Sequence, residues 1–128
     1  MSNNKFYYLS LIFENSCWNI HGLWPQFNKT SYPQYCKNVT FNPSLLNPIK
    51  SDLEKYWSSD RESDNKFWEH EWKKHGSCMF TNMNEFNYFN KALTLFKKVS
   101  SMGIIEKYRQ DDKAMIPFDL NFKIINKL

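Results

Sequence analysis

The sequence predicts one domain in which β-strands near the N-terminus are combined with α-helices further along the chain. Two observations support this mixed fold. Residues 5–13 form an apolar run rich in Phe, Tyr, Leu and Ile, which is typical of a buried strand. Residues 84–101 instead place large apolar side chains at helical intervals. With 128 residues, the chain has the length of a single small domain, residues 1–128.

A second short strand is expected over residues 17–20, after a polar turn, and it would place His21 at its end. Gly22 and Pro25 favour a tight, irregular path directly after that strand. Residues 26–48 have no hydrophobic period and contain several Pro, Asn and Ser residues, so a loop is predicted there.

The remainder is predicted to be mainly helical. Residues 49–57 have the apolar spacing of a short helix, and a polar connector over 58–65 leads to a second helix that begins near Lys66. The third helix, over 84–101, has Asn82 or Asn84 as its N-cap and ends at Gly103. Residues 117–128 fit either a strand or a helix, because their apolar residues satisfy both periods.

Composition sets broad limits on function. Aromatic residues make up 18% of the chain, so the core is expected to depend on Trp, Phe and Tyr. The net charge of +4 suits a polyanionic partner but is too small to identify one. No segment is apolar enough to span a membrane.

Residues 67–78 are the most unusual part of the chain, because titratable side chains alternate there with aromatic ones. On a helix, Glu71, Lys74 and His75 share one face and His70 projects from its flank, since each residue turns by about 100°. Two interpretations remain open from this segment alone: a catalytic site, or an amphipathic helix with ion pairs along its rim.

A zinc site is not expected in this helix. A helical zinc motif needs histidines at positions i and i+4. His70 and His75 are at i and i+5, about 140° apart, and cannot both bind one ion from a regular helix.

A second segment favours the catalytic interpretation. Residues 20–25 read Ile-His-Gly-Leu-Trp-Pro, and residues 70–78 read His-Glu-Trp-Lys-Lys-His-Gly-Ser-Cys. Together they resemble the paired active-site segments of the T2-type ribonucleases. The resemblance implies an α+β fold with an antiparallel sheet packed by helices. Because members of this family generally continue further, fewer C-terminal strands than usual are expected.

The resemblance also implies a set of catalytic roles. His75 would be the general base and His21 the general acid, Lys74 would neutralise the phosphoryl oxygens, Glu71 would orient the site, and His70 would hold the phosphate. The expected activity is endonucleolytic cleavage of single-stranded RNA to 2′,3′-cyclic phosphate ends by a monomer, without metal or cofactor.

Three further residues are candidates for substrate binding. The family stacks bases on the positions of Trp24 and Phe67, although both side chains fit a core role as well. Gln26 stands where members often carry Asp, so base preference is not predicted. Tyr32 and Tyr35 are additional candidates for the same pocket.

The resemblance implies a disulfide between Cys36 and Cys78, which leaves Cys17 as an unpaired thiol among the three cysteines. Members of the family are usually secreted or vesicular, whereas the first residues here do not match a signal peptide, so the compartment is left open.

The alternative function is a catalytically weak or inactive homologue that binds RNA or another protein. The presence of all five catalytic positions argues against it.

Overall fold

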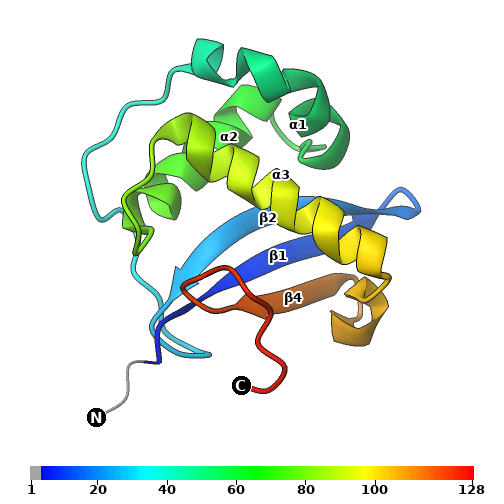
Figure 1. Cartoon of the computed structure of the whole chain (residues 1–128). Helices are drawn as coiled ribbons and strands as arrows, with labels where there is room; N and C mark the ends of the chain where they lie inside the picture. Colours follow the sequence, from blue (N-terminus) through cyan, green and yellow to red (C-terminus); the bar gives the residue numbers. More distant parts are fainter. Residues whose placement is uncertain (1–3) are drawn as a thin grey trace.

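The computed structural model describes residues 4–128, and in this range it shows an antiparallel sheet packed by helices (Figure 1). The strand order is β2-β1-β4-β3, and all neighbouring strands are antiparallel. The strands are β1 (Phe6–Glu14), β2 (Cys17–Gln26), β3 (Arg109–Gln110) and β4 (Lys113–Phe118). The helices are α1 (Lys50–Tyr56), α2 (Asp64–Lys74) and α3 (Glu85–Met102), with 3₁₀ turns η1 (Pro43–Ile49), η2 (Gly76–Cys78) and η3 (Ile105–Tyr108). The predicted α+β fold is confirmed.

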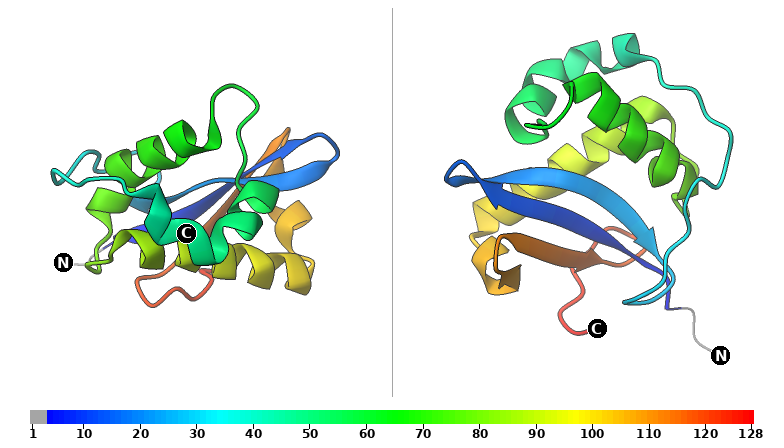
Figure 2. Two further views of the ribbon diagram at one scale, coloured as in Figure 1. Left: turned by 90° about the horizontal axis from the view of Figure 1, so that it is seen from above. Right: turned by 180° about the vertical axis from the view of Figure 1, so that it is seen from behind.

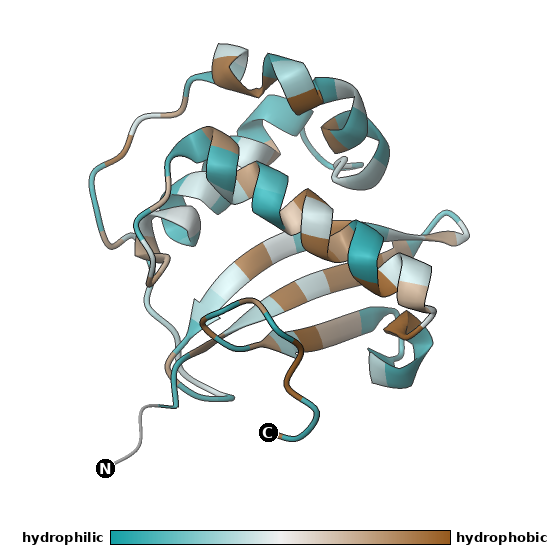
Figure 3. Ribbon diagram, in the orientation of Figure 1, coloured by the Kyte–Doolittle hydropathy of each residue, from teal (hydrophilic) through white to brown (hydrophobic). Residues whose placement is uncertain are grey.

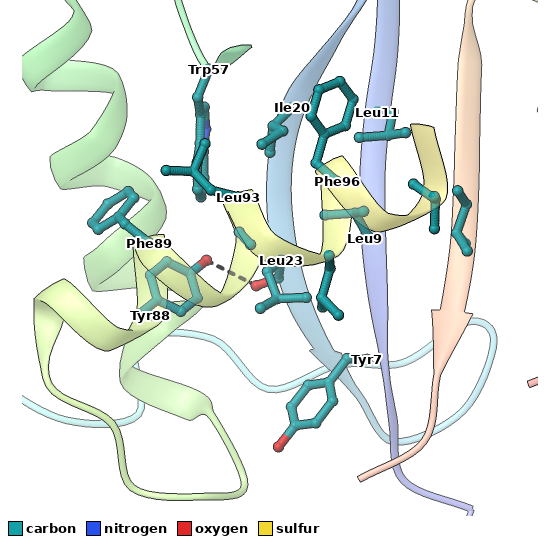
Figure 4. Packing of buried hydrophobic residues seen from close by; sticks show 14 of the residues in the cluster. Tyr7, Leu9, Leu11, Ile20, Leu23, Trp57, Tyr88, Phe89, Leu93 and Phe96 are labelled. Atoms are coloured by element: carbon teal, nitrogen blue, oxygen red, sulfur yellow. Dashed lines mark hydrogen bonds between the residues drawn. The ribbon is translucent and has the colours of Figure 1, made fainter. Parts of the chain in front are cut away.

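Helix α3 covers one face of the sheet, while α1 and α2 lie on the β2 side (Figures 1 and 2). Beneath α3, Leu9 of β1 and Ile20 and Leu23 of β2 are fully buried (Figure 4). The Tyr88 hydroxyl of α3 donates a 2.8 Å hydrogen bond to the Leu23 carbonyl, which fixes the helix on the strand. Hydrophobic positions recur along the strands and α3 (Figure 3), so the core lies between them. We call the opposite side of the sheet the outer face.

The predicted ends of α3 are confirmed. The Asn84 side chain accepts a hydrogen bond from the backbone N–H of Asn87, which satisfies one of the donors at the start of the helix. Gly103 ends the helix with a φ of 68°, a left-handed conformation that glycine adopts without the cost of a Cβ atom.

Three sequence predictions were wrong. β2 does not stop at residue 20 but continues to Gln26, and it tolerates Pro25 because it is an edge strand. Part of the predicted loop forms η1, where the Asn42 side chain accepts a hydrogen bond from the backbone of Ser44. The C-terminal strand, β4, begins before the segment that the ambiguous pattern covered. From residue 119 on, the chain forms turns, apart from an isolated bridge at Ile124.

Within residues 4–128, none of the helices combines the length and the apolar character that crossing a membrane requires.

Candidate active site

His21 owes its position to a β-bulge in β2. Gly22 pairs with Ser10 and Ile20 pairs with Leu11, so His21 is the extra residue that has no partner on β1. Bulges of this kind re-aim side chains next to active sites. The indole N–H of Trp57 donates a 3.2 Å hydrogen bond to the His21 carbonyl, which satisfies the group that leaves the strand ladder. His21 therefore lines the outer face, whereas Ile20 lies in the core.

Helix α2 is anchored by its tryptophans. Trp68 and Trp72 are buried, and their indole N–H groups donate to the carbonyls of Trp57 and Thr40 at 2.6 and 2.9 Å. The expected core role of both residues is confirmed. Glu69 forms a 2.7 Å ion pair with a lysine one turn later, on the solvent side. This arrangement turns the face that carries Glu71 toward β2.

Trp24 joins the two predicted segments. Its indole N–H donates a 2.8 Å hydrogen bond to Oε1 of Glu71, and its ring stacks on His75 with centroids 4.9 Å apart and planes 24° from parallel. Gly22 allows this approach, because a Cβ atom there would collide with the Glu71 carboxylate and the Trp24 indole. The glycine is thus required by packing on the outer face, not by a tight turn.

All five predicted catalytic side chains line one pocket of about 330 Å³. Trp24, Gln26 and Tyr32 line the same pocket. The remaining lining residues are Tyr8, Lys29, Thr30 and Met115, none of which lies in the two motifs. Two segments about 50 residues apart in the sequence therefore lie side by side around this pocket.

A second hollow of about 730 Å³ adjoins the pocket and shares His21, His70 and Glu71 with it. Phe67 lies in this second hollow, 5.9 Å from the His21 ring between centroids. Tyr35 lines neither hollow, and its backbone N–H donates to the Lys74 carbonyl at 2.9 Å. It thus supports the end of α2 rather than the pocket.

Burial controls the charge of two of the candidate groups. His75 is 4% exposed, and desolvation, followed by the charges of Lys74, His70 and His21, lowers its pKa to about 3. Glu71 is 2% exposed, and desolvation raises its pKa to about 8, although the Trp24 hydrogen bond and Lys74 oppose the increase. Near pH 6 both groups are therefore uncharged, and Lys74 supplies the positive charge beside them.

One ring nitrogen of His75 has no hydrogen-bond partner within residues 4–128. This atom, Nδ1, is buried, and the Nε2 atom lies 4.0 Å from Oε1 of Glu71. A neutral imidazole has one nitrogen without a proton, so the ring as a whole can act as a proton acceptor.

His21 has a lowered pKa as well. Desolvation is the largest cause, and the next is the positive charge of Lys113 on β4, followed by His70 and Lys74. Sequence reasoning missed Lys113, because the strand that carries it lies about 90 residues from the first motif and was not recognised.

The Cys36–Cys78 disulfide is present, and Cys17 is an exposed free thiol. The bond fixes the loop after β2 to the turn that follows His75. The backbone N–H of Cys36 also donates to the Ser77 hydroxyl at 3.0 Å. Over residues 4–128 there is no group of three or more His, Cys, Asp or Glu side chains placed to hold a metal ion.

Comparisons with known proteins agree with this geometry. Ribonuclease 1 of Arabidopsis thaliana is 35% identical over 92 residues, which cover 69% of this chain and 40% of that protein. Ribonuclease DdI of Dictyostelium discoideum is 30% identical over 112 residues, 84% of this chain and 50% of that protein. The chain therefore spans half or less of the length of these curated relatives.

The fold is also that of a solved ribonuclease. The structure of ribonuclease MC1 from the seeds of bitter gourd superposes with a TM-score of 0.79 at 18% identity, covering 97% of this chain and 94% of that one. The family model described as "Ribonuclease T2 family" matches residues 4–114. Since this match takes in both motifs and most of the sheet, the chain belongs to the ribonuclease T2 family.

Proposed function

We propose that the protein is an endoribonuclease that cleaves single-stranded RNA by transphosphorylation and leaves 2′,3′-cyclic phosphate ends. The observation that carries the proposal is the convergence of two histidines from separate segments, His21 and His75, with Lys74 in one pocket. RNA contains its own nucleophile, the 2′-hydroxyl. Its cleavage therefore needs a base, an acid and a positive charge near the phosphate.

The geometry supports His75 as the base. At its lowered pKa the ring is neutral over most of the pH range, and because the residue lines the pocket, the ring can take the proton of the 2′-hydroxyl. The 2′-oxygen then bonds to phosphorus as the bond from phosphorus to the 5′-oxygen breaks. His21, when protonated, donates its proton to that departing 5′-oxygen.

Lys74 and His70 surround the position expected for the phosphoryl oxygens, because both line the pocket beside His75. The raised pKa of Glu71 means that its carboxyl carries a proton below about pH 8. An uncharged carboxyl does not repel the phosphate and can donate a hydrogen bond to it.

The proposal assigns different roles to the two aromatic candidates. Trp24 has its N–H bonded to Glu71 and a ring face on His75, which supports a role in positioning these residues more than in stacking a base. Phe67 borders the larger hollow beside His21, where a base attached to the reacting ribose has room to stack. The Gln26 amide donates to the Asn28 carbonyl at 2.9 Å, which leaves its side-chain oxygen for a base.

The proposal is tested with a defined single-stranded RNA in the presence of EDTA, with products identified by mass spectrometry. Cleavage with cyclic phosphate ends is expected. His21→Ala and His75→Ala should each lower the rate by about 10²- to 10⁴-fold, the usual value of one positioned acid or base. Activity that needs added metal, or a variant with nearly full activity, would contradict the proposed mechanism.

A further inference from the structure

The outer face of the sheet carries a third hollow, next to the two that contain the catalytic residues. It has a volume of about 540 Å³ and lies beside the turn between β3 and β4. It shares Tyr8 and Met115 with the catalytic pocket, and Lys113 with the hollow that contains Phe67. The three hollows therefore form a continuous surface from α2 across β1 to the edge of the sheet.

Lys113 occupies the point where two of these hollows meet. It pairs with Ile12 on β1, which pairs in turn with Asn19 on β2, close to His21. Two strand spacings separate it from β2, about 10 Å. This separation agrees with the effect of the Lys113 charge on His21, where it is the second-largest influence on the pKa. A short stretch of extended RNA covers such a span.

Lys113 is exposed, and within residues 4–128 its ammonium group has no hydrogen bond or ion pair. Arg109, which also borders the third hollow, differs in this respect. Its guanidinium lies 4.4 Å from the Phe13 ring centroid and donates to Glu106 at 3.3 Å. Lys107 borders the hollow as well, with its ammonium 5.8 Å from the Tyr108 ring centroid. Of these three cations, only Lys113 also lines the hollow that contains His21.

We propose that Lys113 binds a phosphate of the RNA chain that flanks the scissile phosphate, and that the third hollow accommodates the nucleotide attached to it. The proposal rests on the proposed ribonuclease function. The occupant follows from two features: the unpaired positive charge suits a polyanion, and the surface is continuous with the pocket in which the reacting phosphate would lie. The contact lies outside both sequence motifs.

The test compares a dinucleotide that has only the scissile phosphate with the same dinucleotide carrying an additional 5′- or 3′-terminal phosphate. For the wild-type protein, one of the two additions should raise kcat/KM by about tenfold or more, the usual effect of one hydrogen bond to a charged group. Lys113→Gln should reduce this gain to less than twofold. Lys98→Gln, which removes the charge of an exposed lysine on α3, should retain it.

The readout is the ratio of kcat/KM with the added phosphate to kcat/KM without it. Any effect of Lys113 on the pKa of His21 therefore cancels. A gain that persists in Lys113→Gln overturns the inference while leaving the ribonuclease proposal intact. An equal loss for all three substrates also overturns it, since Lys113 would then act on His21 alone.

If the wild-type protein cleaves no substrate, the proposed function fails, and binding decides the inference. The probe is then a 2′-O-methyl trinucleotide, whose affinity is measured at several salt concentrations. Lys113→Gln should weaken binding and reduce the slope of log K against log salt by about 0.7, the value for one phosphate contact on a single strand. An unchanged affinity and slope would overturn the inference.

Discussion

The indole N–H of Trp24 on β2 donates a 2.8 Å hydrogen bond to the Glu71 carboxyl on α2, and this bond joins the two halves of the candidate site. Glu71 is almost fully buried, so the acceptor has no access to bulk water. The same tryptophan stacks on His75. Trp24 thus makes a hydrogen bond to Glu71 and a stacking contact with His75. A substitution that keeps the ring but removes the N–H distinguishes the two contacts.

Trp24→Phe keeps an aromatic ring beside His75 but removes the donor to Glu71. Leaving a buried acceptor without a partner should lower the free energy of unfolding by about 1–3 kcal/mol. Urea denaturation measures the loss. Trp18→Phe is the control, because it removes a 2.9 Å hydrogen bond from an indole to an exposed carboxylate, Glu106. Equal losses in the two variants would show that burial of Glu71 has no special effect.

Gly22→Ala tests the close packing between β2 and α2. The added methyl group would collide with Glu71 and Trp24, so we expect a loss of about 1–3 kcal/mol and a large decrease in RNA cleavage. Gly103→Ala is the control. It places a Cβ atom at a φ of 68° with no heavy atom within 4 Å, so it should cost stability but leave the activity of the folded protein unchanged. Full activity in Gly22→Ala would contradict the described contact.

The stability of the protein should be greatest in weakly acidic solution. The folded pKa of His75 is about 3 and its ordinary value is 6.5, so the unfolded chain binds more protons between these values and stability increases with pH there. For Glu71 the folded pKa of about 8 exceeds the ordinary 4.5, so the folded chain binds more protons and stability decreases with pH. The two effects oppose each other between pH 4.5 and 6.5, where a plateau is expected.

Glu71→Gln isolates the carboxyl contribution. The difference in unfolding free energy between wild type and variant should decrease by up to about 1.4 kcal/mol per pH unit as the pH increases from 4.5 to 8. Urea denaturation at a series of pH values measures this slope. A difference that does not depend on pH would mean that Glu71 is ionised in the folded protein.

In the proposed mechanism His21 is the general acid, so its pKa should determine how kcat/KM falls at higher pH. A general acid must be protonated, and burial and the charge of Lys113 lower the pKa of this histidine below 6.5. The value of kcat/KM should therefore decrease as the pH increases through the mildly acidic range. Lys113→Gln should move this decrease to higher pH. A rate that keeps increasing into alkaline solution would indicate a different acid.

The grouping of the candidate residues on α2 could be predicted from the sequence, because the second motif carries them at fixed spacing along a regular helix. Glu71, Lys74 and His75 share a helix face in any regular helix, and Trp68 and Trp72 fall on another. The ends of α3 could be predicted for a similar reason, since Asn84 and Gly103 are strong local signals.

The remaining features depend on contacts between distant segments. His21 was expected at the end of a strand, but pairing with β1 extends β2 past it and converts it into a bulge. Gly22 looked like a turn residue, yet its role is to leave space for Glu71, which lies about 50 residues later. Lys113 carries no local signal, because its importance comes from the order of strands in the sheet. Local periodicity contains no information on any of these relationships.

The disulfide should account for a large part of the stability of the protein. Cys36 and Cys78 are 42 residues apart, and closing a loop of that length stabilises the folded state by about 4 kcal/mol on the chain-entropy model. The bond holds the loop after β2 against the end of α2, where the Tyr35 N–H also bonds to the Lys74 carbonyl. We therefore expect the double variant Cys36→Ala, Cys78→Ala to lose stability and to bind RNA less tightly.

The control is Cys17→Ser, at an exposed free thiol, whose free energy of unfolding should stay within about 0.5 kcal/mol of wild type. Thiol titration under denaturing, non-reducing conditions gives an independent measure: one reactive thiol per chain agrees with the bond. Three thiols, together with a double variant as stable as wild type, would show that the protein folds without it.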